Sequence, residues 1–245
     1  MIEKKVYIKN LEINYKIIGE GNPLLILHGW GSNSSRWQEV AESLNMKVII
    51  PDLPGFGKSN KPPVPWNLDE YCSFLEEFIK NLNFEKIYLV GHSFGGAIAV
   101  KYSLKYPEKV EKMFLVNAAL IRKKTFRKTF LLIFSKLFKP LSRIPILKKA
   151  FYKFLVKSDY NETQGFMRKT YLNIVKENLL DRLEDVKVPT MIIWGENDNI
   201  TPLKQGKIIH SKIENSEIEI IPRIDHNPHL SIPEYLAESI NNSIK

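Results

Sequence analysis

The chain has 245 residues, 44% of them hydrophobic and 26% charged, which suits one large globular domain with a sizeable core. Its single cysteine, Cys72, excludes an internal disulfide bond and a cysteine-based metal framework. The net charge is +9, but it is concentrated in positions 118–158, which hold twelve Lys or Arg and no acidic residue. The rest of the chain has 24 basic and 27 acidic residues, a net charge of −3. No nucleic-acid-reading module accompanies this charge, so nucleic-acid binding is not expected.

No targeting or membrane segment stands out. The first residues run directly into strand-like sequence without the apolar stretch of a signal peptide. The longest run of large apolar residues in the middle of the chain, Phe130–Phe134, is far shorter than a membrane span. These features predict a cytoplasmic protein.

The strand pattern begins with alternation and continues with uninterrupted apolar runs. Residues 6–8 and 11–18 alternate apolar and polar side chains, as a half-buried antiparallel hairpin does. Continuous apolar runs are typical of strands buried on both faces of a parallel sheet. Such runs cover residues 23–27, 47–50, 87–90, 113–116 and 190–194, with 218–221 as a further candidate.

Helical patterns separate most of these strands, and the alternation predicts a mostly parallel sheet with right-handed crossovers. The expected helices cover residues 35–44, 68–82, 95–106, 202–211 and 233–244. The alternation breaks once, over 119–185, where Leu, Phe and Ile mix with Lys and Arg. We expect three or four inserted helices there, so that 1–118 and 186–245 form the core.

The strongest motif is Gly91-His92-Ser93-Phe94-Gly95-Gly96, between a buried strand and a helix. It is a G-x-S-x-G nucleophile elbow in the strand–turn–helix context that the motif requires. So tight a turn demands glycine two residues on either side of the serine, and it exposes the Ser93 hydroxyl at the edge of the sheet. The backbone N–H of Phe94, at the helix N-terminus, is positioned to bind an oxyanion.

A second motif, Leu27-His28-Gly29-Trp30-Gly31, follows the third predicted strand. The loop at this place supplies the other oxyanion-hole donor in such folds, which we assign to the backbone N–H of Trp30. Trp30 and Phe94 are also the predicted substrate-binding residues.

The acid and the base are found further along the chain. Asp198 follows the strand that ends at Trp194, and His226 lies between the last strand and the last helix. The order Ser93, Asp198, His226 is the one expected for a nucleophile, an acid and a general base in this fold. Asn117 takes the position after the preceding strand where some relatives place the acid, which favours Asp198. His226 and His229 lack a third ligand, so no metal site is predicted.

With these motifs the chain resembles the α/β-hydrolase superfamily over nearly its whole length. The segments 28–31 and 52–57 are particularly similar to carboxylesterases that demethylate pimeloyl-acyl-carrier-protein methyl ester in biotin synthesis. The resemblance implies an eight-stranded, mostly parallel sheet flanked by helices, with a helical cap over 119–185. One departure is Asp225, because the residue before the catalytic histidine is commonly glycine. Its carboxylate either alters the titration of His226 or points to solvent.

The predicted function is hydrolysis of carboxylic esters or thioesters through an acyl-enzyme, without a cofactor or a metal. A serine at position 93, rather than an aspartate, argues against the haloalkane dehalogenases and epoxide hydrolases of this fold. Two alternatives remain open. One is a carbon–carbon bond hydrolase with the same triad, and the other is a ligand- or membrane-surface-binding protein with little turnover.

The inserted segment is the expected specificity element. Some of its apolar side chains should line an acyl pocket, while the twelve basic residues of 118–158 form either a solvated face or a docking surface. The partner would be an acidic protein, such as an acyl-carrier protein, or an anionic membrane surface. The apolar candidates are Phe126, Phe130, Leu131, Phe134, Leu137, Phe138, Phe151, Phe154 and Leu155.

Overall fold

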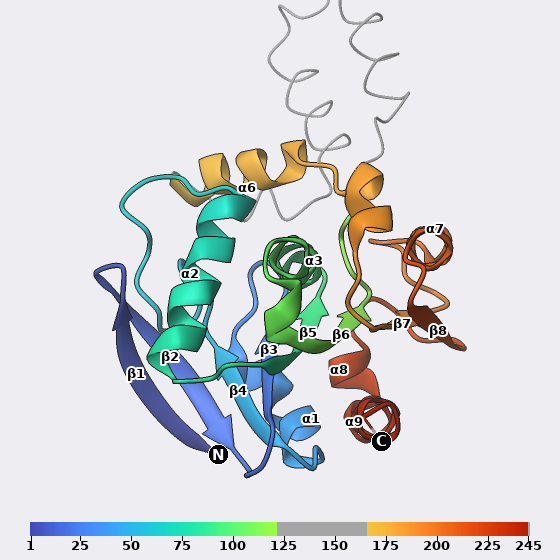
Figure 1. Cartoon of the computed structure of the whole chain (residues 1–245), viewed down its shortest axis with the longest axis horizontal. Helices are drawn as coiled ribbons and strands as arrows, with labels where there is room; N and C mark the ends of the chain where they lie inside the picture. Colours follow the sequence, from blue (N-terminus) through green and yellow to red (C-terminus); the bar gives the residue numbers. More distant parts are fainter. Residues whose placement is uncertain (122–165, 245) are drawn as a thin grey trace, which may run out of the picture.

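The computed structural model describes residues 1–121 and 166–244. Eight strands form one sheet in the order β1-β2-β4-β3-β5-β6-β7-β8 (Figure 1). β2 pairs antiparallel with β1 and β4, and all other neighbours are parallel. The strands are β1 (Ile2–Ile8), β2 (Leu11–Ile18), β3 (Pro23–Leu27), β4 (Lys47–Pro51), β5 (Ile87–His92), β6 (Val110–Val116), β7 (Thr190–Gly195) and β8 (Ser216–Ile221).

Helices cover both faces of this sheet (Figure 1). Side chains of α2, α3 and α7 belong to one apolar cluster, and side chains of α1 and α9 belong to the other. The α-helices are α1 (Gln38–Glu42), α2 (Leu68–Asn81), α3 (Phe94–Lys105), α6 (Phe166–Lys176), α7 (Leu203–Lys212), α8 (Pro228–Ser231) and α9 (Pro233–Asn242). Short 3₁₀ helices are η1 (Ser34–Trp37), η2 (Pro107–Lys109) and η4 (Leu180–Asp185).

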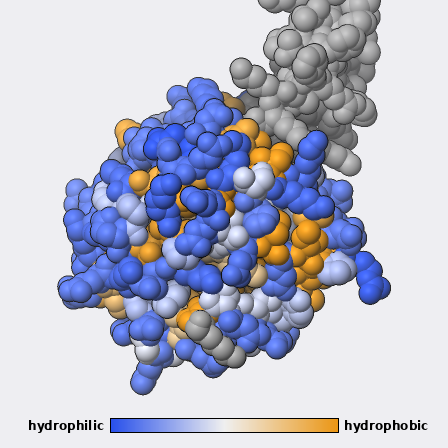
Figure 2. All heavy atoms as spheres, turned by 45° about the vertical axis from the view of Figure 1, so that its right-hand side comes forward, coloured by the Kyte–Doolittle hydropathy of each residue, from blue (hydrophilic) through white to orange (hydrophobic). Residues whose placement is uncertain are grey.

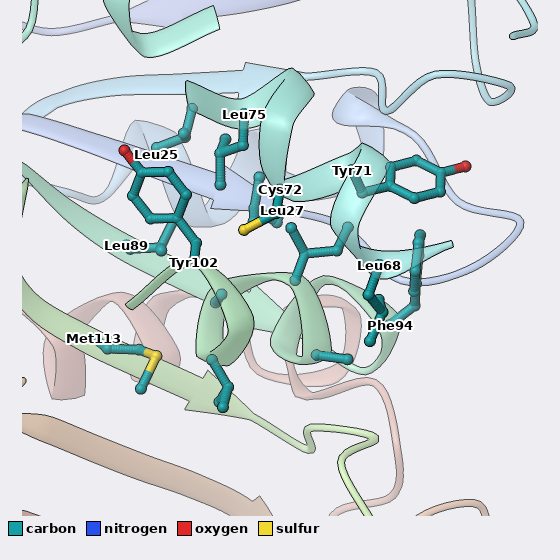
Figure 3. Packing of buried hydrophobic residues seen from close by; sticks show 14 of the residues in the cluster. Leu25, Leu27, Leu68, Tyr71, Cys72, Leu75, Leu89, Phe94, Tyr102 and Met113 are labelled. Carbon is teal, nitrogen blue, oxygen red and sulfur yellow. The ribbon is translucent and has the colours of Figure 1, made fainter. Parts of the chain in front are cut away.

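The apolar runs of the sequence are explained by these two clusters. Successive side chains of a strand point to opposite faces, so a strand covered on both sides must be apolar at every position. Leu25, Leu27 and Leu89 pack under α2 and α3, as Figure 3 shows. Leu24 and Val90 pack on the other face with α1 and α9. The predicted α/β fold with a mostly parallel sheet of eight strands is thereby confirmed.

The helix expected over 35–44 is formed by two consecutive helical segments, η1 and α1. Asn33 caps a 3₁₀ helix, η1, through a hydrogen bond from Ser35 N–H at 3.0 Å. Trp37, with φ −109° and ψ 7°, marks the change from the 3₁₀ helix to α1. Its indole is fully buried in the core.

The predicted insertion over 119–185 lies largely outside the described residues, as do all nine of its acyl-pocket candidates and the twelve basic residues of 118–158. Its described end holds α6 and η4, and α6 lies across the end of α2 in Figure 1. Trp66 N–H donates to Thr170 Oγ1 at 3.1 Å, which ties α6 to the segment leading into α2.

Hydrophilic residues cover most of the face in Figure 2, with smaller groups of hydrophobic residues between them. In the part of the chain that the structure describes, every helix is too short or too polar to cross a lipid bilayer.

Candidate active site

Ser93 lies on a sharp turn between β5 and α3. Its backbone has φ 50° and ψ −113°, a conformation that side-chain-bearing residues rarely adopt and that stores strain. The flanking glycines make the turn possible. A Cβ on Gly91 would lie 2.7 Å from the carbonyl oxygen of Gly95, and a Cβ on Gly95 would lie 2.1 Å from that of Leu27. The turn leaves Ser93 half-buried beyond the carboxyl end of β5.

The two assigned oxyanion-hole donors come from adjacent loops. Phe94 is the first residue of α3, so its N–H belongs to the helical turn that has no acceptor within the helix. The loop that carries Trp30 is held in place by His28, whose Nδ1–H donates to Gly29 O at 2.8 Å. Leu53 N–H donates to the other ring nitrogen of His28 at 3.0 Å. His28 therefore fixes the loop after β3 against the loop after β4.

An aromatic cluster lies beside these donors. The Trp30 ring packs edge-on against Phe56, Phe94 and Tyr171, with centroids 4.8, 5.4 and 5.2 Å away. Tyr171 belongs to α6, the described part of the predicted insertion. Trp30, a predicted substrate-binding residue, therefore contacts the inserted segment directly.

Asp198 and His226 are hydrogen-bonded. His226 Nδ1–H donates to Asp198 Oδ2 at 2.7 Å, although the two residues are 28 positions apart. The Asp198 side chain is completely buried, and that of His226 is 10% exposed. The acid follows β7 and the histidine follows β8, so both lie at the sheet edge that also carries Ser93. The exposed side of the imidazole is thus left for a second proton partner.

Four further donors surround the Asp198 carboxylate. The backbone N–H groups of Ile200 and Thr201 donate to Oδ1 at 2.7 and 2.8 Å. The Thr201 hydroxyl donates to Oδ2 at 2.6 Å, and Asn117 Nδ2 donates to the same oxygen. Burial alone would raise the pKa of this carboxyl, but hydrogen bonds from His226, Asn117 and Thr201 outweigh it and lower the pKa below its usual range. Asp198 is therefore ionised at neutral pH.

Ser93 and His226 are connected through the residue before the serine. His92 Nε2–H donates to the backbone oxygen of His226 at 2.9 Å, and the two imidazole centroids are 5.0 Å apart. Among the described residues, no hydrogen bond joins Ser93 Oγ to the His226 ring. Catalytic hydrogen bonds are often long before substrate binds, and they tighten in the complex.

Asp225, the departure from the family pattern, is exposed. Its Oδ1 accepts a hydrogen bond from Asn227 N–H at 2.9 Å, which closes a local turn. Of the two alternatives for this carboxylate, the structure places it at the surface.

Asn117 and Thr201 were not identified from the sequence as residues whose side chains donate hydrogen bonds to Asp198. Asn117 directly follows β6, and the parallel pairing of β6 with β7 brings it to Asp198, 81 positions away. Thr201 stands three positions after Asp198, a spacing at which a hydroxyl can reach back to a carboxylate. The order of neighbouring strands was the signal for Asn117, and the Asp-x-x-Thr spacing was the signal for Thr201.

Replacing Asn117 with alanine should lower both the turnover number and the stability. The Asn117 side chain donates a hydrogen bond to Asp198 and accepts one from Gly195 N–H at 3.3 Å. The Asn117 backbone has φ 45°, a left-handed conformation that Asn adopts more readily than Ala. We expect a destabilisation of about 1–3 kcal/mol, measured by urea unfolding. Asn117→Gly is the matched variant, because it relieves the backbone strain but not the lost hydrogen bonds. Equal stability of wild type and both variants would contradict this assignment.

Acid should destabilise the fold because burial lowers the pKa of three histidines. Burial lowers the pKa of His28 to about 4 and that of His229 to about 3, and it also lowers the pKa of His92. The unfolded chain, with ordinary values near 6.5, binds more protons, so stability is lost as the pH falls from about 6.5 toward 4. His28 alone accounts for about 3 kcal/mol of this loss.

The check is urea unfolding at a series of pH values between 7 and 4. His229→Phe should lose less stability over that range than the wild type, because one proton-binding site of the unfolded chain has gone. A wild-type stability independent of pH in this window would refute the prediction.

The loops carrying Ser93, Asp198 and His226 thus form one candidate site, and known proteins share its fold. A family model for the α/β hydrolase fold matches residues 22–139. Lipase 1 of Psychrobacter immobilis is 28% identical over 265 residues, covering 98% of this chain and 79% of the lipase. An esterase structure from Exiguobacterium antarcticum superimposes with a TM-score of 0.78 at 23% identity, covering 99% of both chains. These comparisons show that the chain has the α/β-hydrolase fold.

A further relative has a different activity in its name. The 2-hydroxy-6-oxo-2,4-heptadienoate hydrolase of Pseudomonas putida is 24% identical, covering 92% of this chain and 90% of that enzyme. Within residues 1–121 and 166–244, no group of three or more His, Cys, Asp or Glu could hold a metal ion.

Proposed function

We propose that this protein is a serine hydrolase that cleaves carboxylic esters or thioesters through an acyl-enzyme. Ser93 is the nucleophile, His226 the general base and Asp198 the acid. The observation that carries the proposal is the buried Asp198–His226 hydrogen bond of 2.7 Å at the sheet edge where the strained Ser93 turn lies. A buried acid–imidazole pair beside a nucleophile elbow is the arrangement that activates a serine hydroxyl.

The reaction begins with proton transfer. Because Nδ1–H of His226 donates to Asp198, its Nε2 carries the lone pair that accepts the Ser93 proton as Oγ attacks the carbonyl carbon. The ionised carboxylate then stabilises the imidazolium. The backbone N–H groups of Trp30 and Phe94 bind the oxyanion, and losing one such donor typically costs about 10²–10³ in turnover.

Collapse of the tetrahedral intermediate expels the alcohol or thiol, which takes the proton from His226. The same imidazole then acts as base for a water molecule that attacks the acyl-enzyme, and the carboxylic acid product is released from Ser93. The chain's own residues perform each step.

The aromatic cluster favours an apolar acyl group. Trp30, Phe56, Phe94 and Tyr171 contact one another beside the assigned oxyanion donors, and such side chains bury hydrocarbon well. The relative named a lipase supports an ester substrate. A carrier-bound methyl ester is the finer form of this proposal, and it comes from the resemblance of segments 28–31 and 52–57.

Carbon–carbon bond hydrolysis is the second candidate. It is favoured by the Pseudomonas putida relative, which matches this chain almost end to end. The same three side chains would serve either reaction, so the nature of the substrate distinguishes them.

A substrate panel tests the proposal. Aryl esters with acyl chains of increasing length are compared with vinylogous diketones, using kcat/KM as the readout. The proposal expects measurable turnover of the esters and a preference for apolar acyl groups over charged ones. Turnover of the diketones without turnover of any ester would instead support the carbon–carbon bond hydrolase.

Three expectations from the sequence remain predictions. The cap over 119–185 and the docking of an acidic protein or anionic membrane depend on residues 122–165, outside the described part. The cytoplasmic location rests on the sequence alone.

A further inference from the structure

His92, the residue before the nucleophile, joins two parts of the site that are 134 positions apart. It is 4% exposed, and its Nε2 lies 2.9 Å from the backbone oxygen of His226. It belongs to the end of β5, whereas His226 belongs to the loop that follows β8. Its ring therefore links the elbow that carries Ser93 to the backbone of the proposed base.

The geometry sets the proton position on this ring. A carbonyl oxygen only accepts, so Nε2 must carry the hydrogen of this bond. Nδ1 is buried, and no partner for it is found among the described residues. A proton on Nδ1 would lack an acceptor and would leave Nε2 facing the carbonyl lone pairs. Burial, reinforced by His229 and His226 nearby, lowers the pKa of His92, which keeps the ring neutral.

The surroundings fix the ring in this orientation. His229 and Trp37 pack against it, with centroids 4.5 and 5.9 Å away, and the Trp37 and His229 rings stack at 4.5 Å. On another side, a Cβ on Gly29 would lie 2.9 Å from His92 Nδ1. So enclosed a ring cannot swing away from His226 without disturbing its neighbours.

We infer that His92 is a positioning residue for the hydrolytic reaction: its Nε2–H holds the His226 backbone so that the imidazole stays within reach of Ser93. This inference rests on the proposed function, since it assigns a task only if Ser93 and His226 exchange a proton. His92 itself transfers no proton. It acts on the rate because a displacement of about 1 Å between reacting groups can cost about 10²-fold.

Four variants of the full chain test the inference. His92→Phe keeps a buried ring but removes the donor, and His92→Gln restores an N–H near the Nε2 position. His229→Phe keeps an aromatic ring packed against His92, removes only the two ring nitrogens of residue 229, and leaves the bond between His92 and His226 in place. Ser93→Ala reports whether turnover depends on the proposed nucleophile. Readouts are kcat and KM for an aryl ester, the rate of Ser93 labelling by a small fluorophosphonate, and Tm.

We expect His92→Phe to lower kcat and the labelling rate by about 10- to 100-fold with KM little changed. His92→Gln should recover most of that loss, and His229→Phe should keep a near wild-type kcat even if its Tm falls. A wild-type kcat in His92→Phe, equal losses in the two Phe variants, or a Gln variant as slow as Phe would overturn the inference. If Ser93→Ala keeps its activity, the proposed function itself fails.

A measurement on the unaltered protein covers the case in which His92→Phe does not fold. Nitrogen-15 NMR of the imidazoles reports which ring nitrogen is protonated. We expect His92 as the Nε2–H tautomer at neutral pH, with slow exchange of that hydrogen. The Nδ1–H tautomer would exclude the bond to His226 and overturn the inference.

Discussion

Ser93→Ala should abolish ester hydrolysis, with kcat reduced by about 10⁴-fold or more. The hydroxyl is the only part of the residue that the variant removes, and the strained turn, the backbone donors and the Asp198–His226 pair stay in place. What remains is the rate that oxyanion binding and substrate positioning give to direct attack by water. The measurement is steady-state hydrolysis of the best aryl ester from the panel.

Ser103→Ala is the matched control. This serine is also buried, lies on α3 and donates to Val100 O at 2.9 Å, so its loss removes one hydroxyl of the same helix. Turnover in Ser103→Ala should stay near wild type. Comparable activity in Ser93→Ala and the wild type would mean that another group is the nucleophile.

Asp198→Asn should lower kcat by about 10⁴-fold while leaving the chain folded, as the equivalent change does in the type case of a serine triad. An amide that presents its NH₂ group toward His226 favours the wrong imidazole tautomer, with the proton on Nε2, where the Ser93 proton must arrive. The amide also provides no negative charge to stabilise the imidazolium. Activity and far-UV circular dichroism are measured on the same preparation.

Asp225→Asn provides the comparison for this second variant. Asp225 adjoins His226 in the sequence, but its carboxylate is exposed and bonds to Asn227 N–H. Neutralising it should change kcat little. If instead Asp225→Asn is the inactive variant and Asp198→Asn retains turnover, the acid has been assigned to the wrong aspartate.

Much of the fold follows from the sequence because burial on two faces leaves an unambiguous pattern. The run 23–27 is apolar at every position, since alternate side chains enter opposite clusters. Trp37 shows the limit of such patterns: the helical pattern over 35–44 does not tell that the first turn is the 3₁₀ helix η1 and that α1 begins only at Gln38. Helix ends and the type of the first turn are the part of a helix that a sequence pattern specifies least.

The triad candidates were also accessible from the sequence, because each stands in a loop just after a strand and local chemistry marks it. Two residues that hold the triad candidates in place could not be identified from the sequence. Asn117 and His92 act through partners 81 and 134 positions away, and such contacts depend on strand order and loop conformation. Tyr171 touches Trp30 only because α6 lies over the loops at the edge of the sheet. No local pattern around these residues encodes a distant neighbour.

The most direct test of the central claim is to identify the residue that forms the covalent intermediate. The protein is treated with a fluorophosphonate, digested, and analysed by tandem mass spectrometry. We expect a single modified peptide with the phosphonyl group on Ser93, and no labelling after Asp198→Asn under the same short exposure. A phosphonyl group on another residue, or full activity of a protein labelled at Ser93, would contradict this claim.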